Sequence, residues 1–101
     1  MKKEIFNQYY IIVCERYGIV PEELFAKGRK ANVAEARHML YFLCQRRNMR
    51  IKFIQDCLAE RGVKVAHPNI IHGTRTIQKL VDTDKDYAHM VDTIADSVSI
   101  C

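Results

Sequence analysis

The sequence lacks the features of a membrane protein or of a secreted precursor. Its longest apolar run, Tyr9 to Cys14, is far shorter than the roughly 18 residues that cross a membrane. The N-terminal segment leads straight into an amphipathic stretch, with no apolar h-region and no small-residue cleavage site. We therefore expect a cytoplasmic protein with no membrane partner.

Catalytic and metal-binding motifs are also missing. The sequence contains no G-x-x-x-x-G-K-[ST], no H-E-x-x-H and no G-x-S-x-G motif, so no enzyme activity and no cofactor are predicted. The cysteines form no C-x-x-C pair, and His67 and His72 stand five residues apart, a poor spacing for two ligands on one helix face. We expect no metal site.

The cysteines instead suit the interior of the protein. Cys14, Cys44 and Cys57 lie among apolar residues of expected helices, whereas Cys101 ends the chain. Reduced cysteines behave as small core residues. This use of cysteine predicts a reducing compartment, which agrees with the cytosol.

What the sequence does contain is a basic middle between acidic ends. The stretch from Lys27 to Lys79 holds twelve basic and three acidic residues, whereas the rest of the chain holds four basic and nine acidic ones. The formal net charge of +4 therefore hides a strong asymmetry. Such asymmetry predicts a polyanionic partner for the middle segment.

The apolar spacing is helical throughout, and no segment alternates with the period of a strand. With no repeat, low-complexity stretch or long linker, residues 1–101 are expected to form one domain. We predict an all-α bundle of five or six helices, at 3–17, 22–26, 32–47, 50–61 and 68–81 and after Thr83.

Local signals predict how these helices begin. Asn32 with Glu35, and Thr83 with Asp86, are spaced as capping residues. Pro68 is expected as the first residue of its helix. Gly18 is expected to end the first helix in the left-handed conformation. Gly73 lies beside the apolar stripe Ile70, Thr74, Ile77 and Val81, which predicts the close approach of another helix.

Helices 50–61 and 68–81, joined by a glycine-containing turn, have the order and size of a helix-turn-helix. The second helix would carry His67 and Asn69 at its start and His72 and Arg75 on its outer face. Asparagine and histidine hydrogen-bond base edges, while lysine and arginine neutralise phosphates. Plainer roles stay open, with His67 as a helix cap, His72 as packing, and Arg47 as a favourable charge at a helix end.

Two segments carry a family resemblance. The segment YGIVPEELFAKGRKANVAEARHMLYFL (17–43) has a tyrosine-ended helix, a short helix, a basic loop and a counterpart of A-R-P-R-Q. The segment HPNIIHGTRTIQKL (67–80) parallels D-H-T-T-V-L-H-A-x-x-K-I. From about Ile5 to Asp96 the chain resembles the C-terminal DNA-binding domain of the bacterial replication initiator DnaA, without its ATPase.

The resemblance implies roles for single residues. Arg29 would enter the minor groove from the basic loop, and Arg37 would read a base in the major groove beside His38. His67 would contact a base or the backbone, and Pro68 and Asn69 replace two threonines of the family. Departures from the family pattern are Val65, Ala66, the acidic Glu35 in the A-R-P-R element, and a turn about four residues longer.

We therefore expect sequence-specific binding to double-stranded DNA, in replication or its regulation, inside a bacterium or by a phage protein acting there. Lys27 to Lys30 would follow the DNA backbone. Further candidate phosphate contacts are Arg47, Arg50, Lys52, Lys64 and Arg75. The alternatives are a protein-interaction module that binds a replication or transcription protein, and a transcription regulator. RNA binding shares the charge but lacks an aromatic stacking platform. The sequence gives neither the target site nor the oligomeric state.

Overall fold

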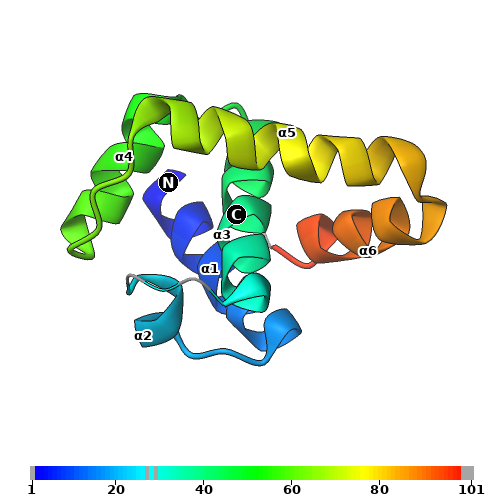
Figure 1. Ribbon diagram of the computed structural model, residues 1–101, viewed down its shortest axis with the longest axis horizontal. Helices are drawn as coiled ribbons and strands as arrows, with labels where there is room; N and C mark the ends of the chain where they lie inside the picture. Colours follow the sequence, from blue (N-terminus) through cyan, green and yellow to red (C-terminus); the bar gives the residue numbers. More distant parts are fainter. Residues whose placement is uncertain (1, 27, 29, 99–101) are drawn as a thin grey trace.

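The computed structural model describes residues 2–26, 28 and 30–98. These residues form six helices and no strand, which confirms the all-α prediction (Figure 1). The helices are α1 (Lys2–Tyr17), α2 (Pro21–Leu24), α3 (Ala31–Arg46), α4 (Ile51–Glu60), α5 (His67–Thr83) and α6 (Lys85–Asp96).

Helix α3 is the central element, as its broad apolar surface predicts. Its side chains from Met39 to Cys44 are all buried, and it packs chiefly against α5 and α1. In Figure 1, α3 runs through the middle of the molecule and α5 lies across its end. Each buried side chain of this size contributes ~1.5–3 kcal/mol to folding. The long, rigid α5 is therefore held on a well-packed support.

The crossing of α3 and α5 depends on Gly73. This glycine is buried, and a Cβ atom built there would lie 2.7 Å from Cδ2 of His38 and 2.9 Å from Cδ2 of Tyr41. Real Cβ atoms do not approach other carbons this closely. The predicted close approach at Gly73 is confirmed. The expected stripe around it is only partly buried, because Ile70 and Ile77 are fully enclosed whereas Thr74 and Val81 are half-buried.

Several predicted helix ends differ from the observed ones. Gly18 follows α1 with a φ of +65°, as expected. Asn32, however, lies inside the first turn of α3, whose N-cap is Lys30. Pro68 is the second residue of α5, because His67 already has helical geometry and Ala66 is the N-cap. The caps expected at Asn32 and His67 were therefore wrong, and Pro68 lies one position farther into its helix than expected.

The Thr83–Asp86 capping box was wrong. Asp84 caps α6, and its Oδ1 accepts hydrogen bonds from the backbone N–H groups of Asp86 at 2.9 Å and Tyr87 at 3.2 Å. Thr83 is the last residue of α5 and donates its hydroxyl to the carbonyl of Lys79. An aspartate accepts such bonds with full charge, which explains why it takes the cap position over the neighbouring threonine.

Cysteine burial agrees with the sequence. Cys14, Cys44 and Cys57 are buried and free, and burial raises the pKa of each thiol. They are small core residues, as predicted, whereas Cys101 lies outside the described residues. Among the residues that the structure describes, no helix is both long enough and apolar enough to traverse a bilayer.

Candidate nucleic-acid interface

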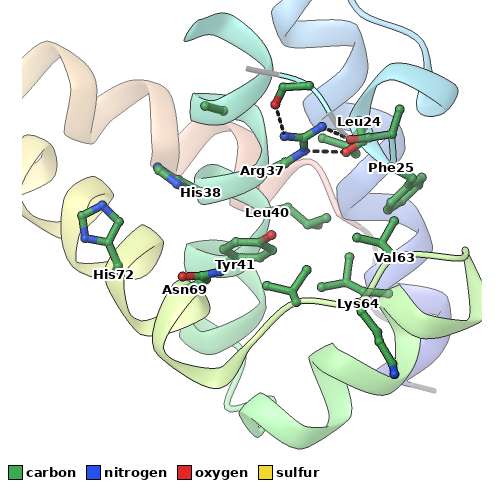
Figure 2. Close-up of a pocket in the computed structure, with 15 residues that line it drawn as sticks. Leu24, Phe25, Arg37, His38, Leu40, Tyr41, Val63, Lys64, Asn69 and His72 are labelled. Carbon is green, nitrogen blue, oxygen red and sulfur yellow. Dashed lines mark hydrogen bonds between the residues drawn. The ribbon is translucent and has the colours of Figure 1, made fainter. Parts of the chain in front are cut away.

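A cleft of about 410 Å³ opens where the helix-turn-helix meets the segment between α2 and α3 (Figure 2). The turn between α4 and α5 forms one wall, and its path is fixed by Gln55, which donates to the Val65 carbonyl at 2.9 Å. Of the predicted DNA-contacting residues, the cleft is lined by Arg37, His38, Lys64, Asn69 and His72. These residues come from α3, the turn and α5, so tertiary packing brings them to one face.

The start of α5 lies open beside this cleft. His67, Pro68 and Asn69 are all exposed, and so are His72 and Arg75 farther along the helix. Pro68 has no N–H group, but the first-turn positions of a helix have no intrahelical acceptor for that group in any case. One side of the leading turns of α5 is therefore open to solvent, while Ile70 and Gly73 on the other side are buried.

The lining of the cleft carries no negative side chain. No carboxylate lines the cleft among the described residues, and α5 has no acidic residue before Asp82. Within the basic stretch, Glu35 is the one acidic residue that precedes α4, and it lines a different pocket. There it accepts a hydrogen bond from the Tyr17 hydroxyl at 2.5 Å and a longer one from Tyr87 at 3.4 Å. The cleft is therefore an electropositive surface.

Arg37 is held by the protein's own backbone (Figure 2). Its Nε donates to the Leu24 carbonyl at 2.8 Å and its Nη1 to the Gly28 carbonyl at 3.0 Å. Its Nη2 donates to the carbonyl of Glu23 at 3.3 Å and to that of Ala26. A guanidinium has five N–H donors, so these bonds leave one unused. The bidentate base contact that the family resemblance implies stays a prediction, and it would cost at least one of these bonds.

His38 and His72 meet edge to face across the cleft. Their ring centroids lie 5.8 Å apart at an interplanar angle of 88°, one ring from α3 and the other from α5 (Figure 2). Burial lowers the pKa of His38, the charges of His72 and Arg37 lower it further, and Glu35 opposes them. His38 is therefore held neutral at neutral pH, when an imidazole both donates and accepts hydrogen bonds.

This depressed pKa predicts that acidification destabilises the fold through His38. Unfolded histidine titrates near pH ~6.5, so the unfolded chain gains a proton at a pH where folded His38 stays neutral. The free energy of unfolding should fall as the pH drops below about 6.5 toward the folded pKa. Urea unfolding of wild type and His38→Asn between pH 7.5 and pH 5.5 measures this, with a shallower fall expected in the variant.

The matched control is His89→Asn, which changes an exposed histidine of α6. This variant should keep the wild-type fall in stability. Equal pH dependence of wild type and His38→Asn would contradict the neutral state assigned to the half-buried His38.

The remaining predicted residues lie outside the cleft. Arg50 and Lys52 are exposed at the start of α4, where Lys52 pairs with Asp56 at 3.0 Å. Arg47, at the end of α3, is half-buried, and its Nη2 is enclosed without a hydrogen-bond partner. Lys30 is exposed at the start of α3. Lys27 and Arg29 fall outside the described residues.

The sequence did not predict the apolar part of the lining of the cleft. Phe25, Tyr41 and Val63 form apolar parts of its wall. Tyr41 is buried, with its ring against the position of Gly73. Arg61 adds support behind the cleft, because its guanidinium lies 5.5 Å from the Phe25 ring centroid. No periodicity distinguishes a buried ring under a cleft from one inside the core.

The described residues contain no group of three or more histidine, cysteine or acidic side chains arranged to hold a metal ion. What the face offers is exposed amide, imidazole and ammonium groups on a rigid helix and its flanking turn. That set suits recognition of a polyanion with hydrogen-bonding groups on its surface.

Comparisons with known proteins give one match. No family model and no solved structure matches the chain. The chain is 28% identical over 104 residues to the chromosomal replication initiator protein DnaA of Flavobacterium psychrophilum. The alignment covers 99% of this chain and 20% of that protein. The chain thus spans about a fifth of the length of this relative, and over that span it is similar to a region of a DnaA protein.

Proposed function

We propose that this chain is a DnaA-like DNA-binding domain that binds double-stranded DNA through the face formed by the cleft and the outward side of α5. The observation that carries the proposal is the convergence of Arg37, His38, Lys64, Asn69 and His72 on one cleft without a carboxylate. Similarity to a DnaA protein over 99% of the chain supports it. A specific target sequence and a role in replication or its control are part of the proposal.

The major groove of B-form DNA, about 12 Å wide, admits an α-helix. The first turns of α5 enter this groove, with Asn69 and His72 facing base edges and His67 at the helix end. An asparagine amide pairs with N6 and N7 of adenine in a bidentate contact. The base contacts therefore come from the exposed side chains on the outer side of the first half of α5.

Phosphate contacts surround this groove contact. Lys64 lies on the turn before α5 and Arg75 two turns along the helix, while Arg50 and Lys52 lie at the start of α4. Lys52 would leave Asp56 for a phosphate at small cost, because an exposed pair is worth only ~0–1 kcal/mol. Arg47 is a weaker candidate than the sequence suggests, since part of its guanidinium is enclosed.

The proposal predicts opposite behaviour for two neighbouring residues. Asn69→Ala should cost ~1–3 kcal/mol on the preferred duplex and relax the preference at one or two base positions, because it removes a base contact. Lys64→Ala should weaken all duplexes about equally, because a phosphate contact carries no sequence information. Selection from a random duplex pool, followed by fluorescence anisotropy on selected and scrambled duplexes, measures both.

Each variant serves as the control for the other, since both residues line the same cleft and both are exposed. If the pool yields no enriched sequence while Lys64→Ala still weakens binding, the protein binds DNA without sequence specificity. That result would refute the proposed sequence-specific recognition. No duplex binding at all would refute the proposal and favour a protein-interaction module.

A further inference from the structure

Among the side chains at the interface, Arg37 makes the most hydrogen bonds, and these bonds hold the protein's own backbone. Four main-chain carbonyls converge on one guanidinium, from Glu23 and Leu24 in α2 and from Ala26 and Gly28 in the segment that follows. A base-reading arginine needs a free donor pair, whereas this one has a single N–H left. The hydrogen bonds of Arg37 are therefore suited to holding the backbone in place and not to reading a base.

The anchored segment needs such an anchor. Helix α2 has only four residues, so its carbonyls have few intrahelical partners. Ala26, Gly28 and Lys30 are all exposed, and a Cβ at Gly28 would meet nothing within 4 Å, so packing contributes little to holding these three residues in place. The planar fork of Arg37 supplies fixed directions for several hydrogen bonds at once. It ties the segment to the second turn of the rigid α3.

We infer that Arg37 is a positioning residue for DNA binding: it fixes the backbone at Ala26 and Gly28, and with it the placement of Lys30 against the duplex, and does not itself read a base. This inference rests on the proposed function. It assigns to Arg37 an indirect effect, transmitted by the backbone it holds. Lys30, which follows the anchored carbonyls and caps α3, is the described cation whose placement depends on this anchor.

The first test needs no DNA. In Arg37→Ala and Arg37→Lys, amide hydrogen exchange in the peptide covering residues 24–30 should accelerate, while exchange in α5 stays unchanged. Lysine keeps the charge but lacks the fork, so it cannot reproduce four bonds in different directions. Arg46→Ala is the matched control, because it removes the same charge from the same helix at a residue paired with Asp92, away from the cleft.

The second test is a double-mutant cycle on duplex binding. Arg37→Ala should weaken binding about tenfold, and Arg37→Lys should weaken it nearly as much, because the bonds and not the charge are lost. Lys30→Ala should weaken wild type about threefold but have almost no effect in the Arg37→Ala background. Lys64→Ala, on the opposite wall, should keep its full effect in both backgrounds.

Three results would overturn the inference. Wild-type affinity of Arg37→Lys would show that charge alone matters. Independent, multiplying effects of Arg37→Ala and Lys30→Ala would show that Arg37 contacts DNA by itself. Unchanged hydrogen exchange in residues 24–30 would show that the segment does not need the anchor. If wild type binds no duplex, the proposed function fails with it, whereas an additive cycle in a protein that binds overturns only this inference.

Discussion

Raising the salt concentration from about 50 to about 200 mM should weaken duplex binding roughly 10³-fold. Each lysine or arginine that neutralises a phosphate releases condensed counterions, so log K falls with log salt at a slope of about −0.9 per contact. Six contacts from the exposed cations around the cleft and at α4 would give a slope near −5. Titration of a labelled duplex by anisotropy at four salt concentrations measures this slope.

The slope also locates the contacts. Lys64→Ala and Arg75→Ala should each make it shallower by about one. Lys85→Ala removes an equal charge from the exposed start of α6 and should leave the slope unchanged. A slope near zero for wild type, or an equal change on removing Lys85, would mean that the duplex does not meet the proposed face.

Gly73→Val should lower the free energy of unfolding by about 3 kcal/mol or more, the largest expected loss of stability from a single substitution at the interface. The added Cβ alone would lie 2.7 Å from His38 and 2.9 Å from Tyr41, and the two methyl groups crowd the same crossing. A loss of this size lowers Tm by roughly 10–25 °C for a domain of about 100 residues. Thermal unfolding followed by circular dichroism measures it.

The Gly73→Ala variant combines two opposing effects on stability, a gain in helix propensity and a steric clash. Gly73→Ala gains ~0.5–1 kcal/mol of helix propensity but should still be destabilising by about 1–3 kcal/mol through the clash. Adding His38→Ala should recover part of that loss, because one of the two clashing rings is gone. Gly28→Ala is the control for unfolding alone, since nothing lies within 4 Å of its added Cβ. A stabilised Gly73→Ala would contradict the tight crossing.

Much of the fold was predictable because it depends on periodicity. The apolar faces of 3–17, 32–47 and 50–61 match α1, α3 and α4 to within one or two residues at each end. Helix ends were less predictable, since neighbouring polar residues compete for the same cap. The sequence pattern does not state which side chain reaches the free N–H groups at the start of α6. Thr83 was therefore predicted as the cap, whereas Asp84 takes that position.

Periodicity predicts only the exposed part of the candidate site, and the contacts of these residues with DNA stay a prediction. His67, Asn69, His72 and Arg75 follow from the outward face of one helix, which the 3.6-residue period gives directly. The bonds of Arg37 do not follow from any pattern, because main-chain carbonyls are present at every residue and the choice among them is made by tertiary packing. Glu35 likewise found its partners, Tyr17 and Tyr87, on helices far apart in the sequence.

The two sides of α5 will not tolerate change equally. Asn69, His72 and Arg75 are exposed, so substitutions there should have little effect on folding, whereas the proposed function expects them to alter recognition. Gly73, between them, is locked against α3. Under the proposed function, a lineage carrying this domain could acquire new target sites by exchanging the three outward residues, provided that the glycine at the crossing is inherited unchanged.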